Sequence, residues 1–257
     1  MRVVVFITRI ITIKILVREP IVIGTSSPSS TTKVVHLPLK GRQKEVKMNN
    51  KGKFIVFEGI DGSGKTTQIN KLCEYLENKG RKVYVTSEPT ISLTGGMLRD
   101  ALSGVSKRTS CEMAAMFVLD RIFHNVNQKW GIEKMLADGY DVLCDRYYYS
   151  SLAYQGSETD FEWVKSMNLN CPEIRTPDAC VFLDLTPEES LERISNSRAT
   201  TEIYETKEKL TAVRNKFLSV FDELKDREGE KIYIISAFGD VETVAKRISD
   251  AVDEVIG

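Results

Sequence analysis

The sequence predicts a three-layer α/β fold, in which helices cover both faces of a parallel five-stranded sheet. From Lys53 onward, short apolar stretches that suit buried strands alternate with longer amphipathic stretches that suit helices. Helices between consecutive short strands favour right-handed crossovers, which leave the strands parallel. A chain of 257 residues with 42% hydrophobic content is also long enough to bury one such core.

The alternation continues along the rest of the chain. The expected strands are Lys53–Glu58, Lys82–Ser87, Asp141–Asp145, Ala179–Leu185 and Lys231–Ser236. The expected helices are Gly64–Lys79, Gly95–Leu102, Cys111–Asp138, Pro187–Ser195, Glu205–Lys225 and Val241–Val255. Ligands of such sheets bind where the parallel strands end. The charged residues found at those ends are Glu58, Glu88, Asp145, Arg146 and Asp184.

The first expected strand leads directly into a phosphate-binding loop. Gly59-x-x-x-x-Gly64-Lys65-Thr66 matches the pattern in which backbone N–H groups surround phosphate oxygens at a helix N-terminus. Lys65 is expected to contact the β- and γ-phosphates, and the hydroxyl of Thr66 to bind Mg²⁺. A glycine-rich turn without a ligand is the alternative, but the strand before the loop and the helical pattern after it argue against it. The sequence therefore predicts nucleotide binding and a P-loop NTPase type of fold.

Composition excludes several other classes. The net charge is zero, yet residues 1–47 contain nine Lys and Arg against two acidic residues, so the remainder of the chain is acidic. Proteins that bind nucleic acids need basic surface, so no nucleic-acid partner is expected. No uncharged run approaches the ~20 residues that span a membrane, so no membrane partner is expected either. The five cysteines contain no C-x-x-C pair, which indicates reduced thiols in a cytoplasmic compartment.

The first 47 residues differ from the rest in composition. They are basic, rich in Val and Ile, and contain a Ser/Thr/Pro-rich stretch. One interpretation is an organelle-targeting segment. The other, which we favour, is an extension that is disordered or absent from the mature enzyme, because Met48 lies just ahead of the first core strand and β-branched residues disfavour an amphipathic helix. We expect the catalytic domain to comprise residues 48–257.

Two further patterns suggest a substrate site. Phe117 and Arg121 are four residues apart and project from the same helical face, which suits a flat heteroaromatic ring; a solvated surface helix is the plainer alternative.

Asp145 and Arg146 follow a buried strand beside the phosphate loop. Asp145 is placed to bind Mg²⁺ or its waters, and Arg146 to hold a phosphate with two hydrogen bonds. An ordinary surface ion pair is the alternative.

Three motifs, in this order and spacing, resemble those of thymidylate kinases. They are Glu58-Gly59-Ile60-Asp61-Gly62-Ser63-Gly64-Lys65-Thr66-Thr67-Gln68, Phe117-x-x-Asp120-Arg121-x-x-His124, and Asp145-Arg146-Tyr147-x-x-Ser150-Ser151-x-Ala153-Tyr154-Gln155-Gly156. Many nucleotide-binding enzymes share the first motif, but the three together are specific. The resemblance extends from about Met48 to Gly257. It implies transfer of the γ-phosphoryl group of ATP to dTMP, with Mg²⁺, by a homodimeric enzyme.

The resemblance also implies roles for single residues. The ATP phosphates would be held by Gly59, Ile60, Asp61, Gly62, Ser63, Gly64, Lys65, Thr66 and Thr67. The substrate dTMP would contact Asp61, Arg99, Phe117, Arg121, Arg146, Ser150, Ser151 and Tyr154. Mg²⁺ would be held by Thr66 and Asp145. The catalytic set would be Lys65, Asp61, Asp145, Arg146 and Arg198.

Within the implied dTMP site, the ring of Phe117 would stack on thymine and Arg121 would read a carbonyl oxygen. Ser150 and Ser151 would lie near the base, with Ser151 a candidate partner for the ring N3–H. Arg99 would grip the phosphate together with the arginine that follows Asp145. Tyr154 would crowd the 2′ position and so disfavour ribonucleotides, whereas the preference for dTMP over dUMP is left open.

Residues 193–204 resemble the short mobile lid of the family. Bacterial-type members have no arginine in the phosphate loop and supply one from the lid, and position 62 here is Gly. Ile203 stands where the lid often has an arginine, so the charge for the transition state would fall to Arg193 or Arg198. We expect Arg198, because it lies within the lid loop itself.

Two other functions stay open from the sequence. A deoxynucleoside kinase, which acts on a 5′-hydroxyl, needs a base just after the second strand, where Glu88 lies. A non-catalytic module that only binds a nucleotide is the second, although the chain contains no N-K-x-D guanine-reading motif.

Overall fold

The computed structural model describes residues 52–197 and 206–257. The expected extension at residues 1–47 lies outside the described residues, and so do Arg198 and most of the expected lid. These expectations stay predictions.

The sheet is parallel throughout and has the strand order β2-β3-β1-β4-β5. Its strands are β1 (Phe54–Glu58), β2 (Lys82–Ser87), β3 (Tyr140–Asp145), β4 (Ala179–Asp184) and β5 (Ile232–Ser236). Each begins and ends within one residue of its predicted position. The predicted five-stranded parallel sheet is confirmed.

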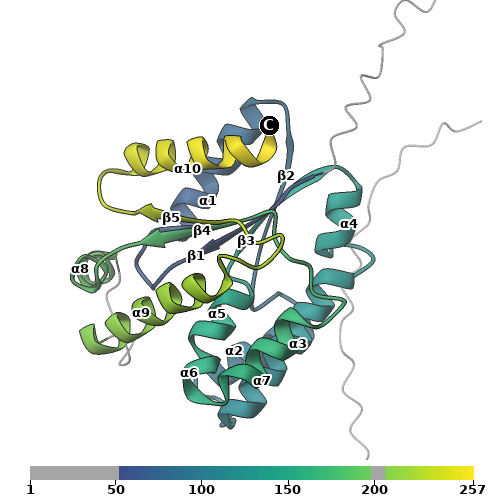
Figure 1. Ribbon diagram of the computed structural model, residues 1–257, viewed down its shortest axis with the longest axis vertical. Coiled ribbons are helices and arrows are strands. Elements are labelled where there is room, and N and C mark those ends of the chain that lie inside the picture. The colour runs from purple at the N-terminus through teal and green to yellow at the C-terminus, as the bar shows by residue number, and fades with distance from the viewer. Residues whose placement is uncertain (1–51, 198–205) are drawn as a thin grey trace, which may run out of the picture. The chain divides into compact units, whose positions relative to one another are not determined.

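Helices cover both faces of the sheet, as Figure 1 shows. One face is covered by α1 (Lys65–Asn78) and α10 (Val241–Ile256). The other is covered by α3 (Ser110–Val126), α4 (Ile132–Ala137), α5 (Tyr148–Ala153), α7 (Phe161–Leu169) and α9 (Lys207–Leu224). The remaining helices of the described part are α2 (Leu93–Leu102), α6 (Gln155–Glu158) and α8 (Pro187–Ser197). None of the helices within residues 52–197 and 206–257 has the length and apolar character needed to cross a membrane.

The alternation of side chains along the strands explains the two layers. Phe54 and Val56 of β1 pack toward α3 and α9, whereas Ile55 and Phe57 pack toward α1 and α10. All four side chains are fully buried. A central parallel strand is covered on both faces, so its sequence is a continuous apolar run.

The prediction of one long helix over Cys111–Asp138 was wrong. The segment forms α3 and α4, separated by a turn at Asn127–Gly131. The side chain of Asn127 accepts hydrogen bonds from the backbone N–H groups of Lys129 (3.0 Å) and Trp130 (3.1 Å), which replaces the helical pattern with a local turn. The backbone of Gly131 approaches Asn127 so closely that an added Cβ would lie 2.5 Å from its carbonyl oxygen.

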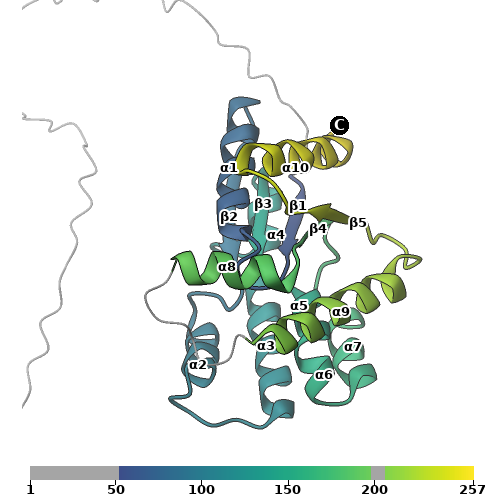
Figure 2. The same ribbon diagram turned by 90° about the vertical axis from the view of Figure 1, so that its left-hand side faces the viewer.

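The sheet topology brings the polar strand ends together. Asp145 is in register with Phe57 on one side and with Ser87 on the other, so β1, β2 and β3 end at the same edge. The hydroxyl of Ser190 in α8 donates to the backbone oxygen of Asp61, so α8 lies against the loop after β1, at the end of the sheet seen in Figure 2. The loop after β1, the turn after β3 and α8 therefore surround one region.

Candidate active site

The loop between β1 and α1 has the geometry of an anion cradle. Gly62 and Gly64 have φ angles of 75° and 91°, which favour glycine, and α1 begins at Lys65. The free N–H groups of the first helical turn therefore lie at the loop. A Cβ on Gly62 would lie 2.9 Å from the backbone oxygen of Ser190 in α8, so position 62 has no room for an arginine.

Lys65 folds back onto this loop. Its Nζ donates hydrogen bonds to the carbonyl oxygens of Gly59 (3.0 Å) and Ile60 (3.3 Å). Burial, together with the positive charge of Arg146, lowers the pKa of Lys65 to about 8. A phosphate in the loop would raise that pKa again, because a neighbouring anion favours the protonated amine.

Thr66 and Asp145 lie side by side at the mouth of the loop. The hydroxyl of Thr66 donates to Oδ2 of Asp145 at 3.5 Å, and Oδ1 of Asp145 is buried without a hydrogen-bond partner among the described residues. Mg²⁺ is usually bound by one or two carboxylates together with water and substrate phosphates. This oxygen set fits Mg²⁺. No group of three or more acidic, His or Cys side chains in the described ranges could hold a metal by itself.

Arg146 is the centre of a first polar cluster. Its Nη2 forms an ion pair with Asp61, its Nη1 donates to the hydroxyl of Ser150 (3.4 Å), and its guanidinium carbon lies 5.7 Å from the ring centroid of Tyr154. Its φ of 69° is the one positive value among non-glycine residues in the described ranges. Its N–H donates to the carbonyl oxygen of Phe57 (2.9 Å), which stabilises this backbone conformation.

Glu58 lies beneath this cluster and was not assigned a role from the sequence. Its fully buried carboxylate accepts hydrogen bonds from the N–H of Tyr147 (2.9 Å), the N–H of Ser150 (3.1 Å) and the hydroxyl of Ser150 (2.6 Å). Burial raises the pKa of Glu58 to about 7, although the charge of Arg146 opposes the shift. An acidic residue at the end of a fully apolar strand was the signal in the sequence.

Arg121 is the centre of a second cluster, where α3, α7 and the end of β2 meet. Its Nη2 lies 2.7 Å from Oε2 of Glu88, and its Nη1 donates to the hydroxyl of Ser151 (3.2 Å) and to the side-chain oxygen of Asn168. Arg121 is 1% exposed. The sequence paired Arg121 with an open heteroaromatic site, whereas the structure surrounds it with protein, and nothing in the sequence pointed to Asn168.

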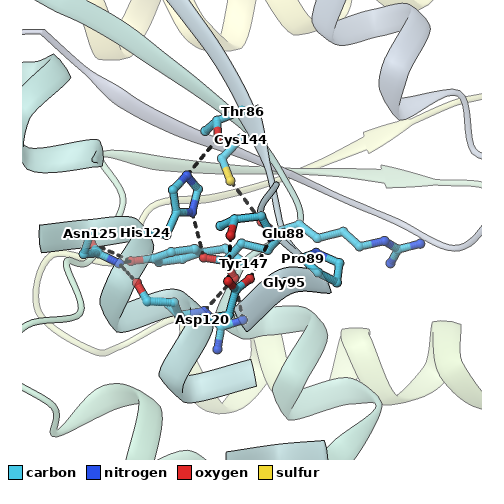
Figure 3. A network of polar contacts seen from close by, with 12 residues as sticks. Thr86, Glu88, Pro89, Gly95, Asp120, His124, Asn125, Cys144 and Tyr147 are labelled. Atoms are coloured by element: carbon cyan, nitrogen blue, oxygen red, sulfur yellow. Dashed lines mark hydrogen bonds and ion pairs between the residues drawn. The ribbon is translucent and has the colours of Figure 1, made fainter. Parts of the chain in front are cut away.

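Glu88 is also held from the other side (Figure 3). Its Oε1 lies 3.0 Å from Nδ1 of His124, and Nε2 of the same ring shares a 2.8 Å hydrogen bond with Thr86. Both oxygens of the Glu88 carboxylate are therefore engaged by side chains of α3. A carboxylate in that position is poorly placed to take a proton from a substrate hydroxyl.

Arg99 and Phe117 lie beside the second cluster. Arg99 is exposed on α2, where it donates to the carbonyl oxygens of Pro89 (3.3 Å) and Thr90. Asp120 of α3 accepts two hydrogen bonds from Thr90, both at 2.7 Å, and so ties this loop to the helix. Phe117 is half-buried one helical turn before Arg121.

A pocket of about 820 Å³ opens over the phosphate loop. Its lining includes, from the predicted site, Asp61, Gly62, Ser63, Gly64, Lys65, Thr66, Thr67, Asp145 and Arg146. The structure therefore brings most of the predicted phosphate site together in one pocket. The predicted residues outside its lining are Gly59, Ile60, Arg99, Phe117, Arg121, Ser150, Ser151 and Tyr154.

Another part of the wall includes Arg193 and Ile194 of α8, which belong to the expected lid, and Arg193 was one of its two candidate arginines. The rest of this part was missed from the sequence: Ala237 and residues 239–241 after β5, and Val244 in α10. The rule that ligands bind at strand ends applied to β5 as well, and would have found this loop. The guanidinium of Arg193 reaches over the cradle, since a Cβ on Gly64 would lie 3.8 Å from its Nη1.

Comparison with known proteins identifies relatives of the chain. A family model described as thymidylate kinase matches residues 57–248. A probable thymidylate kinase of Pyrococcus horikoshii is 37% identical over 200 residues, which cover 76% of this chain and 92% of that protein. A thymidylate kinase of Akkermansia muciniphila is 45% identical over 172 residues, covering 66% and 80%. A thymidylate kinase of Caldicellulosiruptor saccharolyticus is 37% identical over 213 residues, covering 80% and 98%.

Replacing Glu58 by Gln should flatten the pH dependence of stability. Because its pKa rises from 4.5 in the unfolded chain to about 7 in the folded protein, its contribution to stability is fully present below pH 4.5 and is lost as the pH rises through 7. Gln has the same shape but does not titrate. Urea denaturation at a series of pH values should show the wild type losing on the order of 2 kcal/mol relative to Glu58→Gln across this interval. Parallel curves for the two proteins would contradict the assignment.

Proposed function

The chain belongs to the thymidylate kinase family, and from this premise we propose how its residues transfer the γ-phosphoryl group of ATP to dTMP, yielding ADP and dTDP. One observation carries the proposal. Lys65 and Arg146 come from different segments of the chain and line the same pocket. A triphosphate cradle and an arginine suited to an acceptor phosphate therefore share one space.

The donor half of the site is the loop from Gly59 to Thr67. Its N–H groups and Lys65 would hold the ATP phosphates, and Thr66 with Asp145 would hold Mg²⁺, which when bound neutralises part of the phosphate charge. The buried, unpartnered Oδ1 of Asp145 supports this placement. Arg193, which lies on the pocket wall and donates to the carbonyl oxygen of Ala237 (2.9 Å), would contact the same phosphates.

The acceptor half needs little acid–base chemistry. A phosphate oxygen of dTMP is already anionic, so the barrier comes from bringing two polyanions together, and positioned cations lower it. Arg146 would bind the acceptor phosphate, with Asp61 holding its Nη2 in place. Arg99 would add a second cation from α2.

The second cluster would recognise the base. Four of the five N–H groups of Arg121 are directed at Glu88, Ser151 and Asn168, which leaves one on Nη2 without a partner among the described residues. An arginine carries donors only, so that N–H would favour the carbonyl oxygen of thymine over the amino group of cytosine. Phe117 would stack on the ring, and Tyr154, beside Arg146, would crowd the 2′ position.

The two alternatives from the sequence are less well supported. A deoxynucleoside kinase needs a free base after β2, but both oxygens of Glu88 are engaged by Arg121 and His124. A module that only binds a nucleotide would not require, in the same pocket, an arginine suited to an acceptor phosphate.

A substrate panel tests the proposal. With Mg-ATP, the wild type should phosphorylate dTMP faster than dCMP, UMP or thymidine, and removal of Mg²⁺ by EDTA should abolish turnover. Lys65→Ala should lower kcat by at least about a hundredfold, because the transferred charge loses a fixed cation. A coupled assay for ADP measures each rate. Turnover of thymidine without dTMP would replace the proposal by the deoxynucleoside kinase.

Arg198 is proposed, on the sequence argument, to supply charge to the transition state. Arg198→Ala should then lower kcat by about a hundredfold or more and leave the KM for ATP nearly unchanged. Arg193→Ala should instead mainly raise the KM for ATP, because Arg193 lies beside the phosphate cradle. Steady-state kinetics of the two variants separates the roles, and a large loss of kcat in Arg193→Ala alone would transfer the role to Arg193.

We also propose a homodimer. Leu119, Phe123 and Val126 follow one another at helical spacing on α3 and remain exposed, so they form an apolar stripe. In a two-fold dimer the same stripe of a second copy would cover it. Sedimentation should give a dimer for the wild type and a monomer for Phe123→Glu, whereas Ile234→Glu, at the exposed edge strand β5, should stay dimeric. A wild type that sediments as a monomer at micromolar concentration would exclude this interface.

A cytoplasmic location is proposed as well. The five cysteines, all within the described ranges, are free thiols, as is usual where the environment is reducing. Cell fractionation of the full-length protein would test the location.

A further inference from the structure

We propose that Glu58 is a positioning residue, which orients Arg146 toward the acceptor phosphate through the hydroxyl of Ser150. This inference rests on the proposed function and deepens it. The resemblance to the family placed Ser150 near the base, whereas the contacts in the structure connect it to the phosphate-binding arginine. Glu58 itself is fully buried and does not line the pocket.

The first link is between Glu58 and Ser150. Above its pKa of about 7 the carboxylate of Glu58 is ionised and only accepts hydrogen bonds, so the hydroxyl of Ser150, 2.6 Å from Oε2, then directs its proton at Glu58. The N–H of the same serine donates to Oε1 at 3.1 Å, which holds the residue at two points. The rotation of the Ser150 hydroxyl is therefore determined by Glu58.

The second link is between Ser150 and Arg146. Because its proton is directed at Glu58, the Ser150 oxygen offers only lone pairs to Nη1 of Arg146, 3.4 Å away. Asp61 holds Nη2 from the other side. The guanidinium is thus held at both terminal nitrogens, and the side chain of Tyr154 forms a further hydrogen bond with it. Arg146 nevertheless lines the pocket, where the fork of an arginine suits a phosphate.

The backbone supports the same arrangement. Glu58 accepts the N–H of Tyr147 (2.9 Å), and the preceding residue, Phe57, accepts the N–H of Arg146 (2.9 Å). The end of β1 therefore holds the turn in which Arg146 adopts its φ of 69°. Glu58 also contributes a negative charge close to Arg146 and Lys65. One carboxylate thus sets the backbone, the hydrogen-bond direction and the local charge at the acceptor arginine.

Glu58→Gln and Ser150→Ala test the relay. Gln keeps the shape, but it loses the charge and places an amide donor opposite the Ser150 oxygen. Each variant should raise the KM for the acceptor nucleotide about tenfold or more and leave the KM for ATP within about twofold. These assays use the nucleoside monophosphate that the wild type phosphorylates fastest in the substrate panel. If that nucleotide is not dTMP, the proposed function is wrong, but the relay can still be tested.

A double-mutant cycle separates a relay from two independent effects. If Glu58 acts through Ser150, the double variant should have an acceptor KM no higher than the worse single variant. Multiplicative effects on the KM would overturn the inference. If Glu58→Gln does not fold, Ser150→Ala alone tests the inference. An unchanged KM for the acceptor nucleotide in Ser150→Ala would overturn it.

Glu230→Gln is the matched control. Glu230 is likewise buried, and it accepts hydrogen bonds from the hydroxyls of Tyr148 (2.6 Å) and Tyr149, so it holds α5 from the side away from Arg146. Its loss should loosen α5 and lower the melting temperature, but leave the acceptor KM within about twofold. An increase equal to that of Glu58→Gln would mean that general loosening of α5 explains the effect, and the relay would be wrong.

Discussion

The phosphate loop and the Arg146 turn follow neighbouring strands, β1 and β3, and the contacts at the end of β1 hold the two together. Phe57 accepts the N–H of Arg146, and the carboxylate of Glu58 accepts three donors from Tyr147 and Ser150. The loop that starts at Gly59 continues the same strand. Two consecutive residues of one buried strand therefore set the position of the phosphate loop and that of Arg146, the proposed acceptor arginine. Such rigidity matters because phosphoryl transfer depends mainly on positioning.

The two polar clusters hold arginines that, in the proposed function, would meet polyanionic substrates. Arg146 is paired with Asp61, and Arg121 with Glu88. Buried charges without partners are costly, so each arginine is held by a carboxylate before any substrate binds. Lys65 has only carbonyl oxygens as hydrogen-bond partners in the described structure, and burial together with the charge of Arg146 lowers its pKa to about 8. Phosphates would supply the missing negative charge.

Several parts of this architecture could be predicted from the sequence because their causes are local. The apolar run of β1 and the glycine pattern at Gly59–Gly64 each depend on residues that are close in sequence. The break at Asn127 was missed although its cause is also local, because the side chain of one Asn outweighed the helical preference of the residues around it. The wall formed by Ala237 and residues 239–241 was missed because the strand-end rule was not applied to β5.

The order and approximate bounds of the five strands, the phosphate loop, and the charged residues at the strand ends followed from the sequence. The partners of those charged residues became known only from the fold. Glu88 is 33 residues from Arg121, Asn168 is 47 residues from it, and Ser150 is 92 residues from Glu58. Periodicity and turn chemistry act over a few residues, whereas the direction of a buried hydrogen bond depends on which strands become neighbours. The strand order β2-β3-β1-β4-β5 is what places those distant groups within reach of each other.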